Sequence, residues 1–304
     1  MRSESVVNKK INGGGSRNIK TWLLLCLYLC LLPGCGEKAI NPEDIGELLS
    51  NTVAVEQFSR RYLLFVPDTY KRDEPASVIF AFHGTPSTAW EMQNLTNFEE
   101  HAHERGALVV YPQNIIDWNE DCDCSNSERN GVNDVLFIDN IIADLKATYS
   151  IDSTRLYAVG FSQGGLFVDN LICKRSELFA AAATVAATMS VPLSQKCLPR
   201  EPRPMMLFHG TEDGVFPYAG NLNNGNNSTL SAENALSKWG EFMQCYGDPV
   251  IVDEKETFRR SVLSTCGNGA EIQLFTMKGL GHTWPKKEFD AEKRIMAFFD
   301  RFVR

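Results

Sequence analysis

Residues 155–164, Arg155-Leu156-Tyr157-Ala158-Val159-Gly160-Phe161-Ser162-Gln163-Gly164, decide the fold. The first half is a short, almost continuous apolar run that ends at Gly160, as in a buried strand. The second half is a G-x-S-x-G pattern, and an amphipathic stretch begins at Gly164. A strand, a sharp turn and a helix in this order place Ser162 in a strained conformation, because the glycines let the backbones approach closely. The stretch therefore predicts that Ser162 is presented as a nucleophile.

Five more apolar runs of strand length alternate with amphipathic stretches of helix length. The apolar runs are residues 62–66, 77–82, 107–111, 205–208 and 271–276. The amphipathic stretches are residues 89–105, 134–149, 164–175, 231–246 and 290–304. Such apolar runs suit strands that are buried on both faces, and their alternation with helices indicates a parallel sheet. We therefore predict one α/β domain, with a mostly parallel central sheet and helices on both faces.

The composition excludes several classes of protein. The chain has 304 residues, of which 43% are hydrophobic and 22% are charged. These values exclude a disordered chain, a collagen-like repeat and a multi-span membrane protein. The formal net charge of −8 argues against binding to a phosphate backbone, so we expect no nucleic-acid partner.

The N-terminus predicts an export signal. Residues 1–20 carry five basic residues and one acidic residue, and an apolar run follows at residues 22–32. This run is too short to span a bilayer comfortably, since about 20 apolar residues are needed. Leu32-Pro33-Gly34-Cys35 resembles the lipobox of bacterial lipoproteins, in which the cysteine is lipidated and becomes the mature N-terminus. A plain cleaved signal peptide is the alternative.

We therefore expect three parts along the chain. Residues 1–34 form a lipoprotein-type signal peptide, residues 35–57 form a lipidated N-terminus and tether, and residues 58–304 form the catalytic domain. The expected location is outside the cytoplasm, either anchored to the bacterial cell envelope or extracellular. Contact with a membrane is expected only through the lipid on Cys35.

The cysteines also indicate export. Of the nine, two leave with the signal and one takes the lipid, and six remain: Cys122, Cys124, Cys173, Cys197, Cys245 and Cys266. An even number in an exported chain predicts up to three disulfides. A zinc site would need paired clusters of cysteine and histidine, and only Cys122 and Cys124 are clustered. We therefore expect no metal site and no cofactor, and a Cys122–Cys124 disulfide is a candidate.

A serine hydroxyl needs a base to take its proton, and the chain has five histidines. His101 and His103 lie in a charged stretch that is typical of a solvated helix face. His83 and His209 each end a strand before a glycine. His282 lies in a glycine-flanked loop after the last predicted strand, from which a side chain can reach the end of the sheet. We predict that His282 is the base.

The acid is expected between the serine and the histidine, as in the chain order of the α/β-hydrolases. Residues 211–214, Thr-Glu-Asp-Gly, follow the strand predicted at residues 205–208. We predict that Asp213 fixes the tautomer of His282 and stabilises its imidazolium form. The adjacent Glu212 is the competing candidate.

The oxyanion of a tetrahedral intermediate needs backbone N–H donors. One donor is expected from Gln163, the residue after the nucleophile. The second is expected from the loop after an early strand, where Thr85 is the predicted donor. Gly84 permits the close approach there, and Pro86 has no N–H to donate.

Four segments together resemble the exported esterase family that contains polyhydroxybutyrate depolymerases and feruloyl esterases. They are Phe82-His83-Gly84-Thr85, Gly160-Phe161-Ser162-Gln163-Gly164-Gly165, His209-Gly210-Thr211-Glu212-Asp213 with Val215-Phe216-Pro217-Tyr218, and Gly281-His282-Thr283-Trp284-Pro285. The similarity spans about residues 60–304. It implies the α/β-hydrolase fold, with Ser162 as the nucleophile, Asp213 as the acid and His282 as the base.

The resemblance also implies the disulfides Cys173–Cys197 and Cys245–Cys266. The chain departs from the family where Asn133 replaces an acid that is common beside Asp134. The stretch at residues 118–124 is also more acidic than the family leads us to expect. Both departures bear on the choice of substrate and leave the catalytic residues unchanged.

Two tryptophans are candidates for substrate binding. Trp118 and Trp284 are predicted to flank an aromatic acyl group or to stack on a sugar. Packing in the protein core is the alternative for both.

The sequence thus predicts a serine esterase that acts through a Ser-His-Asp triad and an acyl-enzyme. The expected substrates are feruloyl or acetyl esters of plant cell-wall polysaccharide, or short polyhydroxyalkanoate polyesters. A serine peptidase on the same fold and a non-catalytic surface-binding lipoprotein are the alternatives.

Overall fold

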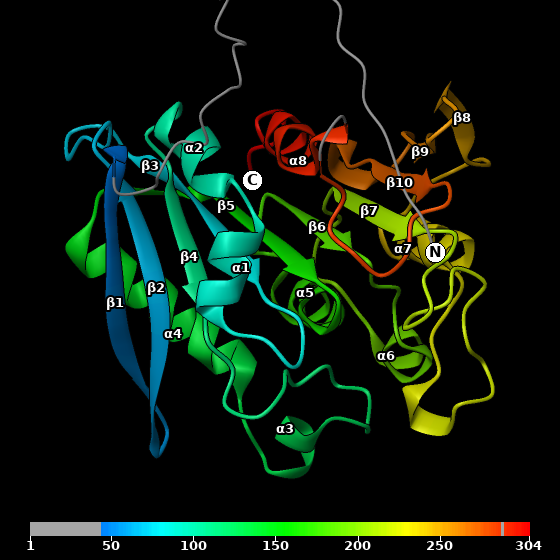
Figure 1. The fold of residues 1–304 in the computed structure, drawn as a ribbon, viewed down its shortest axis with the longest axis horizontal. Coiled ribbons are helices and arrows are strands. Elements are labelled where there is room, and N and C mark those ends of the chain that lie inside the picture. The colour runs from blue at the N-terminus through cyan, green and yellow to red at the C-terminus, as the bar shows by residue number, and fades with distance from the viewer. Residues whose placement is uncertain (1–43, 287–288) are drawn as a thin grey trace, which may run out of the picture. The chain divides into compact units, whose positions relative to one another are not determined.

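The computed structural model describes residues 44–286 and 289–304 (Figure 1). The predicted signal peptide and Cys35 lie outside the described residues. None of the described helices has the length and the apolar character needed to cross a bilayer.

A single ten-stranded sheet runs through the described domain in the order β1-β2-β4-β3-β5-β6-β7-β10-β9-β8. The strands are β1 (Gly46–Val55), β2 (Phe58–Pro67), β3 (Ala76–Phe82), β4 (Leu108–Pro112), β5 (Ile151–Phe161), β6 (Ala181–Val185), β7 (Met205–Gly210), β8 (Val250–Glu254), β9 (Phe258–Leu263) and β10 (Ile272–Met277). The central strands from β4 to β10 pair in parallel. Antiparallel pairs extend the sheet on both sides, with β1 and β2 beyond β4 and with β9 and β8 beyond β10.

Helices cover both faces of the sheet (Figure 1). They are α1 (Ala89–Leu95), α2 (Phe98–His103), α3 (Asn126–Arg129), α4 (Asp134–Thr148), α5 (Gln163–Arg175), α6 (Val191–Lys196), α7 (Ala232–Phe242) and α8 (Ala291–Phe299), with the 3₁₀ turns η2 (Gly225–Asn227) and η3 (Gly267–Gly269). Apolar side chains of α4, α5 and α7 pack in one core cluster, and those of α1, α2 and α8 pack in a second.

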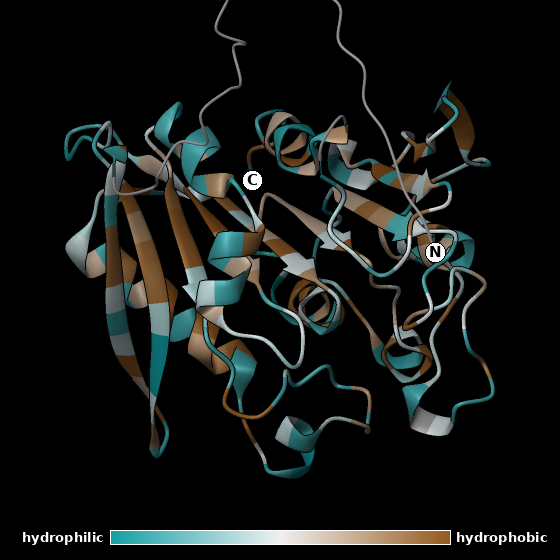
Figure 2. Ribbon diagram, viewed as in Figure 1, coloured by the Kyte–Doolittle hydropathy of each residue, from teal (hydrophilic) through white to brown (hydrophobic). Residues whose placement is uncertain are grey.

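The strands contribute alternate side chains to these two clusters. Val78, Phe80 and Phe82 of β3 belong to the cluster under α4, α5 and α7, and Ile79 and Ala81 belong to the other. Because both faces of the central strands are buried, their sequences are apolar at nearly every position (Figure 2). The prediction of a mostly parallel sheet with helices on both faces is confirmed.

The prediction of a tether over residues 35–57 is wrong for its C-terminal part. Gly46–Val55 forms the edge strand β1, which pairs with β2 along all ten of its residues. Its side chains alternate between exposed positions, such as Thr52 and Ala54, and covered ones, such as Val53 and Val55. This alternation is the period of a strand with one buried face.

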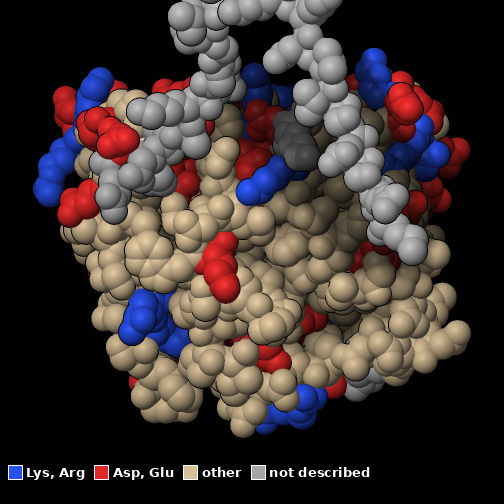
Figure 3. Space-filling model, in the orientation of Figure 1, with Lys and Arg blue, Asp and Glu red and all other residues tan. Residues whose placement is uncertain are grey.

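On the face shown in Figure 3, lysine, arginine, aspartate and glutamate side chains are most numerous along the upper margin. Smaller groups of charged side chains lie at the left side, near the centre and at the lower margin.

The turn from β5 into α5 leaves no room for a side chain at its glycines. A Cβ on Gly160 would lie 2.1 Å from the carbonyl oxygen of Gly164, and a Cβ on Gly164 would lie 2.4 Å from the carbonyl oxygen of Phe82. Because these neighbours are backbone atoms, the clash cannot be relieved by a side-chain rotation.

We expect Gly160→Ala to destabilise the fold by about 1 to 3 kcal/mol or more, as overpacking of a core does. Thermal unfolding followed by circular dichroism measures the effect as a lower Tm. Gly214→Ala is the matched control, because a Cβ at Gly214 meets no heavy atom within 4 Å. Equal Tm values for the two variants would contradict the steric account of the turn.

Candidate active site

Ser162 lies at the carboxyl end of β5 and is the N-cap residue of α5, with φ 54° and ψ −126°. This positive φ is unusual for a residue with a side chain and indicates backbone strain. The strained turn is held in place because the Ser162 N–H donates to the Val185 carbonyl over 2.9 Å. As a result, the Ser162 hydroxyl sits at the end of the sheet, where it lines a pocket.

His282 lies in the loop after β10, and its two ring nitrogens face two different partners. Its Nε2 lies 2.9 Å from Ser162 Oγ, and its Nδ1 lies 2.8 Å from Asp213 Oδ2. The rings of Phe161 and Phe216 flank the imidazole, with centroids 5.4 and 5.7 Å away. These contacts form one continuous chain of hydrogen bonds from the acid to the serine.

The turn after β7 directs Asp213 inward and Glu212 outward. Asp213 is buried, and its Oδ1 accepts the N–H groups of Val215 and Phe216 over 2.9 and 2.8 Å. Glu212 is exposed. The structure therefore brings Asp213, and not the competing Glu212, to His282.

His209 supports the turn that carries Asp213, a role that the sequence analysis did not foresee. Its Nε2–H donates to the Phe216 carbonyl over 2.7 Å, and this nitrogen lies 3.6 Å from Asp213 Oδ2. Burial lowers the pKa of His209. A neutral His209 leaves the Asp213 carboxylate to compensate a positive charge on His282 instead.

His83 has a similar supporting role beside Thr85. Its Nδ1–H donates to the Gly84 carbonyl over 2.7 Å, and its own carbonyl accepts the indole N–H of Trp118 over 2.8 Å. Burial lowers the pKa of His83 to about 4, so the ring is neutral at neutral pH. The loop that contains Thr85 is thus fixed from two sides.

The two predicted oxyanion donors, Thr85 and Gln163, lie in the same pocket as Ser162. A Cβ on Gly84 would lie 3.0 Å from Ser162 Cβ, so glycine allows the loop to pass this close to the serine. Gln163 is the first residue of α5, and N–H groups in the first turn of a helix have no partner within the helix. Their use as oxyanion donors stays a prediction.

The prediction that Trp118 and Trp284 bind substrate is wrong, because both side chains belong to the core. Trp118 has no exposed surface and stacks on Phe167, with ring centroids 5.0 Å apart. Trp284 is 2% exposed and packs edge-on against Phe98 and Phe161. Neither tryptophan lines the pocket beside Ser162.

This pocket has a volume of about 300 Å³. Its lining residues come from several loops and from α5: Thr85, Asp117, Glu120, Cys124, Ser125, Ser162, Gln163, Leu166, Ser190, Val215, Phe216, Asn227 and Thr229. The acidic stretch that departs from the family thus contributes to the pocket wall. Asn133, the other departure, caps α4 instead, because its Oδ1 accepts the N–H of Leu136 over 3.0 Å.

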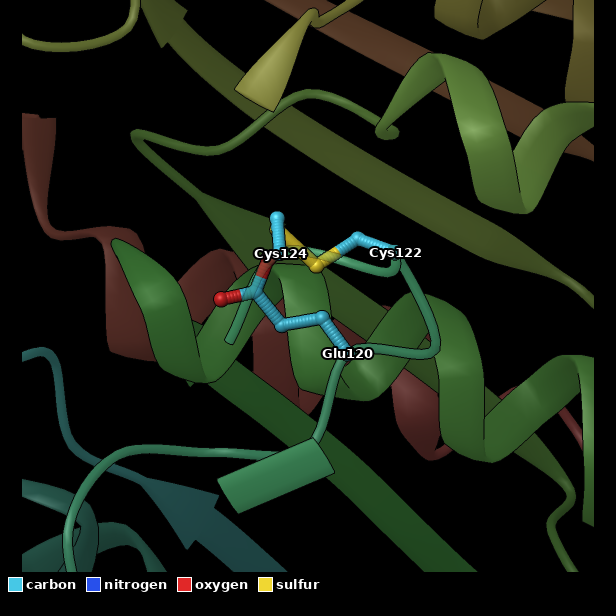
Figure 4. A group of neighbouring side chains, drawn as sticks. All are labelled: Glu120, Cys122 and Cys124. Carbon is cyan, nitrogen blue, oxygen red and sulfur yellow. A yellow bond between two sulfur atoms is a disulfide. The ribbon is translucent and has the colours of Figure 1, made fainter. Parts of the chain in front are cut away.

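Three disulfides are formed in the structure. Cys173–Cys197 joins the last turn of α5 to the residue after α6, and Cys245–Cys266 joins the segment after α7 to the segment after β9. Cys122–Cys124 closes a loop in the pocket wall beside Glu120 (Figure 4). The donor atoms of Glu120, Cys122 and Cys124 lie within 4.8 Å of one another. Because the two sulfurs are bonded to each other, neither is a thiolate ligand for a metal.

Comparisons with known proteins agree with this architecture, although no family model matches the chain. Feruloyl esterase B of Piromyces equi is 26% identical over 234 residues, which cover 73% of this chain and 42% of that esterase. The chain therefore spans less than half the length of this relative. A putative esterase, NocK, of Nocardia uniformis is 24% identical over 273 residues, which cover 82% of this chain and 77% of that protein.

The acetyl xylan esterase of Aspergillus awamori is a solved structure with a similar fold. It superposes with a TM-score of 0.62 at 16% identity, over 84% of this chain and 99% of that one. The chain has the α/β-hydrolase fold. It is related in sequence to carboxylic ester hydrolases.

We expect Asp213→Asn to lower the kcat for p-nitrophenyl acetate by about 10⁴-fold. The amide would keep the contacts to Val215 and Phe216 through its oxygen and would present N–H groups to His282. The ring would then carry its proton on Nε2 and could not accept the proton of Ser162. Glu212→Gln is the matched control and should keep activity within about threefold, since surface substitutions have small effects. A larger loss in Glu212→Gln than in Asp213→Asn would reverse the assignment of the acid.

Proposed function

We propose that the protein is a serine esterase that hydrolyses feruloyl or acetyl esters of plant cell-wall polysaccharide. The observation that carries this proposal is the hydrogen-bonded chain from Asp213 through His282 to Ser162 at the wall of a pocket. The names of the relatives, which include feruloyl and acetyl xylan esterases, favour these esters over the polyester suggested by the resemblance in sequence.

The first half of the proposed reaction forms an acyl-enzyme. Ser162 Oγ attacks the ester carbonyl carbon while His282 Nε2 takes the hydroxyl proton. Asp213 holds the proton on Nδ1 and stabilises the imidazolium. The N–H groups of Thr85 and Gln163 hold the oxyanion, and the carbonyl then reforms as His282 protonates the leaving alcohol oxygen.

The second half returns the enzyme to its starting state. A water molecule enters after the alcohol has left, and His282 takes a proton from it as the water attacks the acyl carbonyl. The second tetrahedral intermediate collapses as the bond between the acyl carbon and Ser162 Oγ breaks. His282 gives the proton back to Ser162, and the free acid leaves.

The cellular location forms part of the proposal. We place the catalytic domain outside the cytoplasm, on a lipid attached to Cys35. The three disulfides support this placement, because disulfides persist in oxidising compartments.

Expression in a bacterial host fed with radioactive palmitate tests the anchor. The full chain should take up label and sediment with membranes, and Cys35→Ala should take up none. Label on Cys35→Ala would rule out the lipidation of this cysteine. An unlabelled full chain that is secreted would favour the plain signal peptide.

The nucleophile is tested by Ser162→Ala, which should lower the kcat for p-nitrophenyl acetate by roughly 10⁵-fold or more. A fluorophosphonate should label the wild type and fail to label this variant. Ser237→Ala is the matched control, because Ser237 lies exposed on α7. Labelling of Ser162→Ala would place the nucleophile elsewhere.

The competing functions give different outcomes in the same assays. A serine peptidase would hydrolyse both a p-nitroanilide amide and the matching ester, though the amide more slowly, whereas the proposed esterase would hydrolyse only the ester. A non-catalytic binding protein would hydrolyse neither and would not be labelled by the fluorophosphonate. The proposed substrates are then compared directly, with methyl ferulate, acetylated xylan and polyhydroxybutyrate.

A further inference from the structure

Glu120 is a buried acidic side chain that lines the pocket beside Ser162 and has no part in the proposed reaction. It is 5% exposed and lies on the loop between β4 and α3. Figure 4 shows its side chain extending toward Cys124, which also lines the pocket. Burying a carboxyl group costs free energy unless the group forms hydrogen bonds, because burial removes its hydration.

Two polar neighbours of Glu120 in this loop, Asp117 and Ser125, are occupied by hydrogen bonds within the loop and α3. Asp117 Oδ1 accepts the Ser127 N–H over 2.6 Å, and its Oδ2 accepts the backbone and side-chain N–H groups of Asn126 over 2.8 and 2.9 Å. The Ser125 hydroxyl oxygen accepts the N–H of Glu128 over 3.1 Å. These contacts hold α3 and the loop in place, so Asp117 and Ser125 serve the wall more than they serve a ligand.

Glu120 is held differently, through the side chain of Gln163. The Gln163 side chain interacts with the Glu120 carboxyl and lowers its pKa, and Gln163 Oε1 accepts the backbone N–H of Trp118 over 3.3 Å. Gln163 is also the residue whose backbone N–H is the proposed oxyanion donor. Glu120 is therefore one side chain away from the reacting atoms.

We propose that Glu120 is a specificity-determining residue whose carboxyl group hydrogen-bonds a hydroxyl group on the part of the substrate that enters the pocket beside Ser162. This inference rests on the proposed ester hydrolysis at Ser162. The hydroxyl group belongs either to the acyl part, as a phenol, or to the alcohol part, as a sugar does. The pocket wall favours one neutral polar group beside apolar contacts, since Leu166, Val215 and Phe216 line it as well.

Burial keeps the Glu120 carboxyl protonated at neutral pH. Its pKa is raised to about 8, mainly by burial and also by the nearby carboxylates of Asp117 and Glu128, while the Gln163 side chain acts in the opposite direction. Asp169 of α5 also interacts with Glu120 and has a raised pKa because of its own burial.

A protonated carboxyl offers one donor and one acceptor, which are the same groups that a hydroxyl offers in return. No lysine or arginine is among the described residues that line this pocket, so a substrate part that carries a carboxylate would be repelled by the carboxylates of Asp117 and Glu128. The wall thus selects a neutral hydroxyl over an anionic group.

The loop is anchored well enough to position this carboxyl. The Cys122–Cys124 disulfide closes the chain directly after Glu120. Asp121, which lies between Glu120 and Cys122 in the sequence, forms ion pairs with Lys174 of α5 and Lys196 of α6 over 2.7 and 2.9 Å. A specificity group needs such support, because a hydrogen bond that selects a substrate must be held in one geometry.

Two pairs of esters that differ by one hydroxyl group test the proposal. The acyl pair is methyl 4-hydroxycinnamate and methyl cinnamate, and the alcohol pair is 2-hydroxycyclohexyl acetate and cyclohexyl acetate. The wild type should favour the hydroxylated ester in one pair by roughly tenfold in kcat/KM, as expected for one hydrogen bond. The pair that shows the preference identifies the part of the substrate that occupies the pocket.

Glu120→Leu should abolish this preference by lowering kcat/KM roughly tenfold for the hydroxylated ester and less than twofold for its partner. Glu120→Gln, which still donates and accepts, should restore most of the preference. Leu166→Ala, on the apolar wall, is the matched control and should change both esters of a pair by the same factor. An equal fall for both esters in Glu120→Leu would show a structural role and overturn the proposal.

Binding to Ser162→Ala separates this proposal from the proposed function. Calorimetry should give a roughly tenfold lower Kd for the hydroxylated ester, and the double variant Ser162→Ala/Glu120→Leu should lose the difference. A wild type that hydrolyses no ester but shows this difference would refute the esterase and retain the Glu120 contact. Equal Kd values, or no binding of either ester, would refute the contact itself.

Discussion

The close approach of two backbones at the turn from β5 into α5 is the constraint on which the site depends. Only glycine fits at positions 160 and 164, since a Cβ at either position would clash with a backbone carbonyl oxygen. The approach forces Ser162 into a positive φ and starts α5 directly behind it. This turn therefore fixes three groups relative to one another: the serine hydroxyl, the first N–H groups of the helix and the Gln163 side chain. The loops after β7 and β10 reach it because parallel strands end at the same edge of the sheet.

Much of the fold follows from local pattern, and what was missed depended on tertiary contacts. Strands that are buried on both faces were predictable because nearly every side chain is apolar. The alanine-rich strand β6 was not predictable, since alanine does not favour a strand. The exposed edge strand β8 owes its place to pairing with β9. The stretch at residues 89–105 forms two helices because Thr96 ends α1 in extended backbone.

In the candidate site, too, some residues were predictable from local sequence patterns, and others depended on tertiary contacts. Ser162, Asp213 and His282 were predictable as a set because each follows a strand in a glycine-rich turn, and the structure brings the three together. The choice between Asp213 and Glu212 could not be made from the sequence, because it depends on which of the two side chains the turn after β7 directs inward. The tryptophans were misassigned because proximity in sequence to a motif does not show which way a ring faces. The acidic stretch at residues 118–124 was recognisable in the sequence, but Glu120 could not be singled out within it, since its burial is produced by residues from distant parts of the chain.

The Cys173–Cys197 disulfide links the compartment in which the chain matures to the shape of its pocket. It joins the two residues that neighbour Lys174 and Lys196, and so holds both ammonium groups against Asp121, next to Glu120. The hydrogen bonds among Ser162, His282 and Asp213 need no sulfur chemistry. A chain that folded in a reducing cytoplasm would thus retain its reactive serine while its pocket wall lost a covalent brace. With the export proposed above, oxidation is a maturation step that adds this brace to the pocket wall.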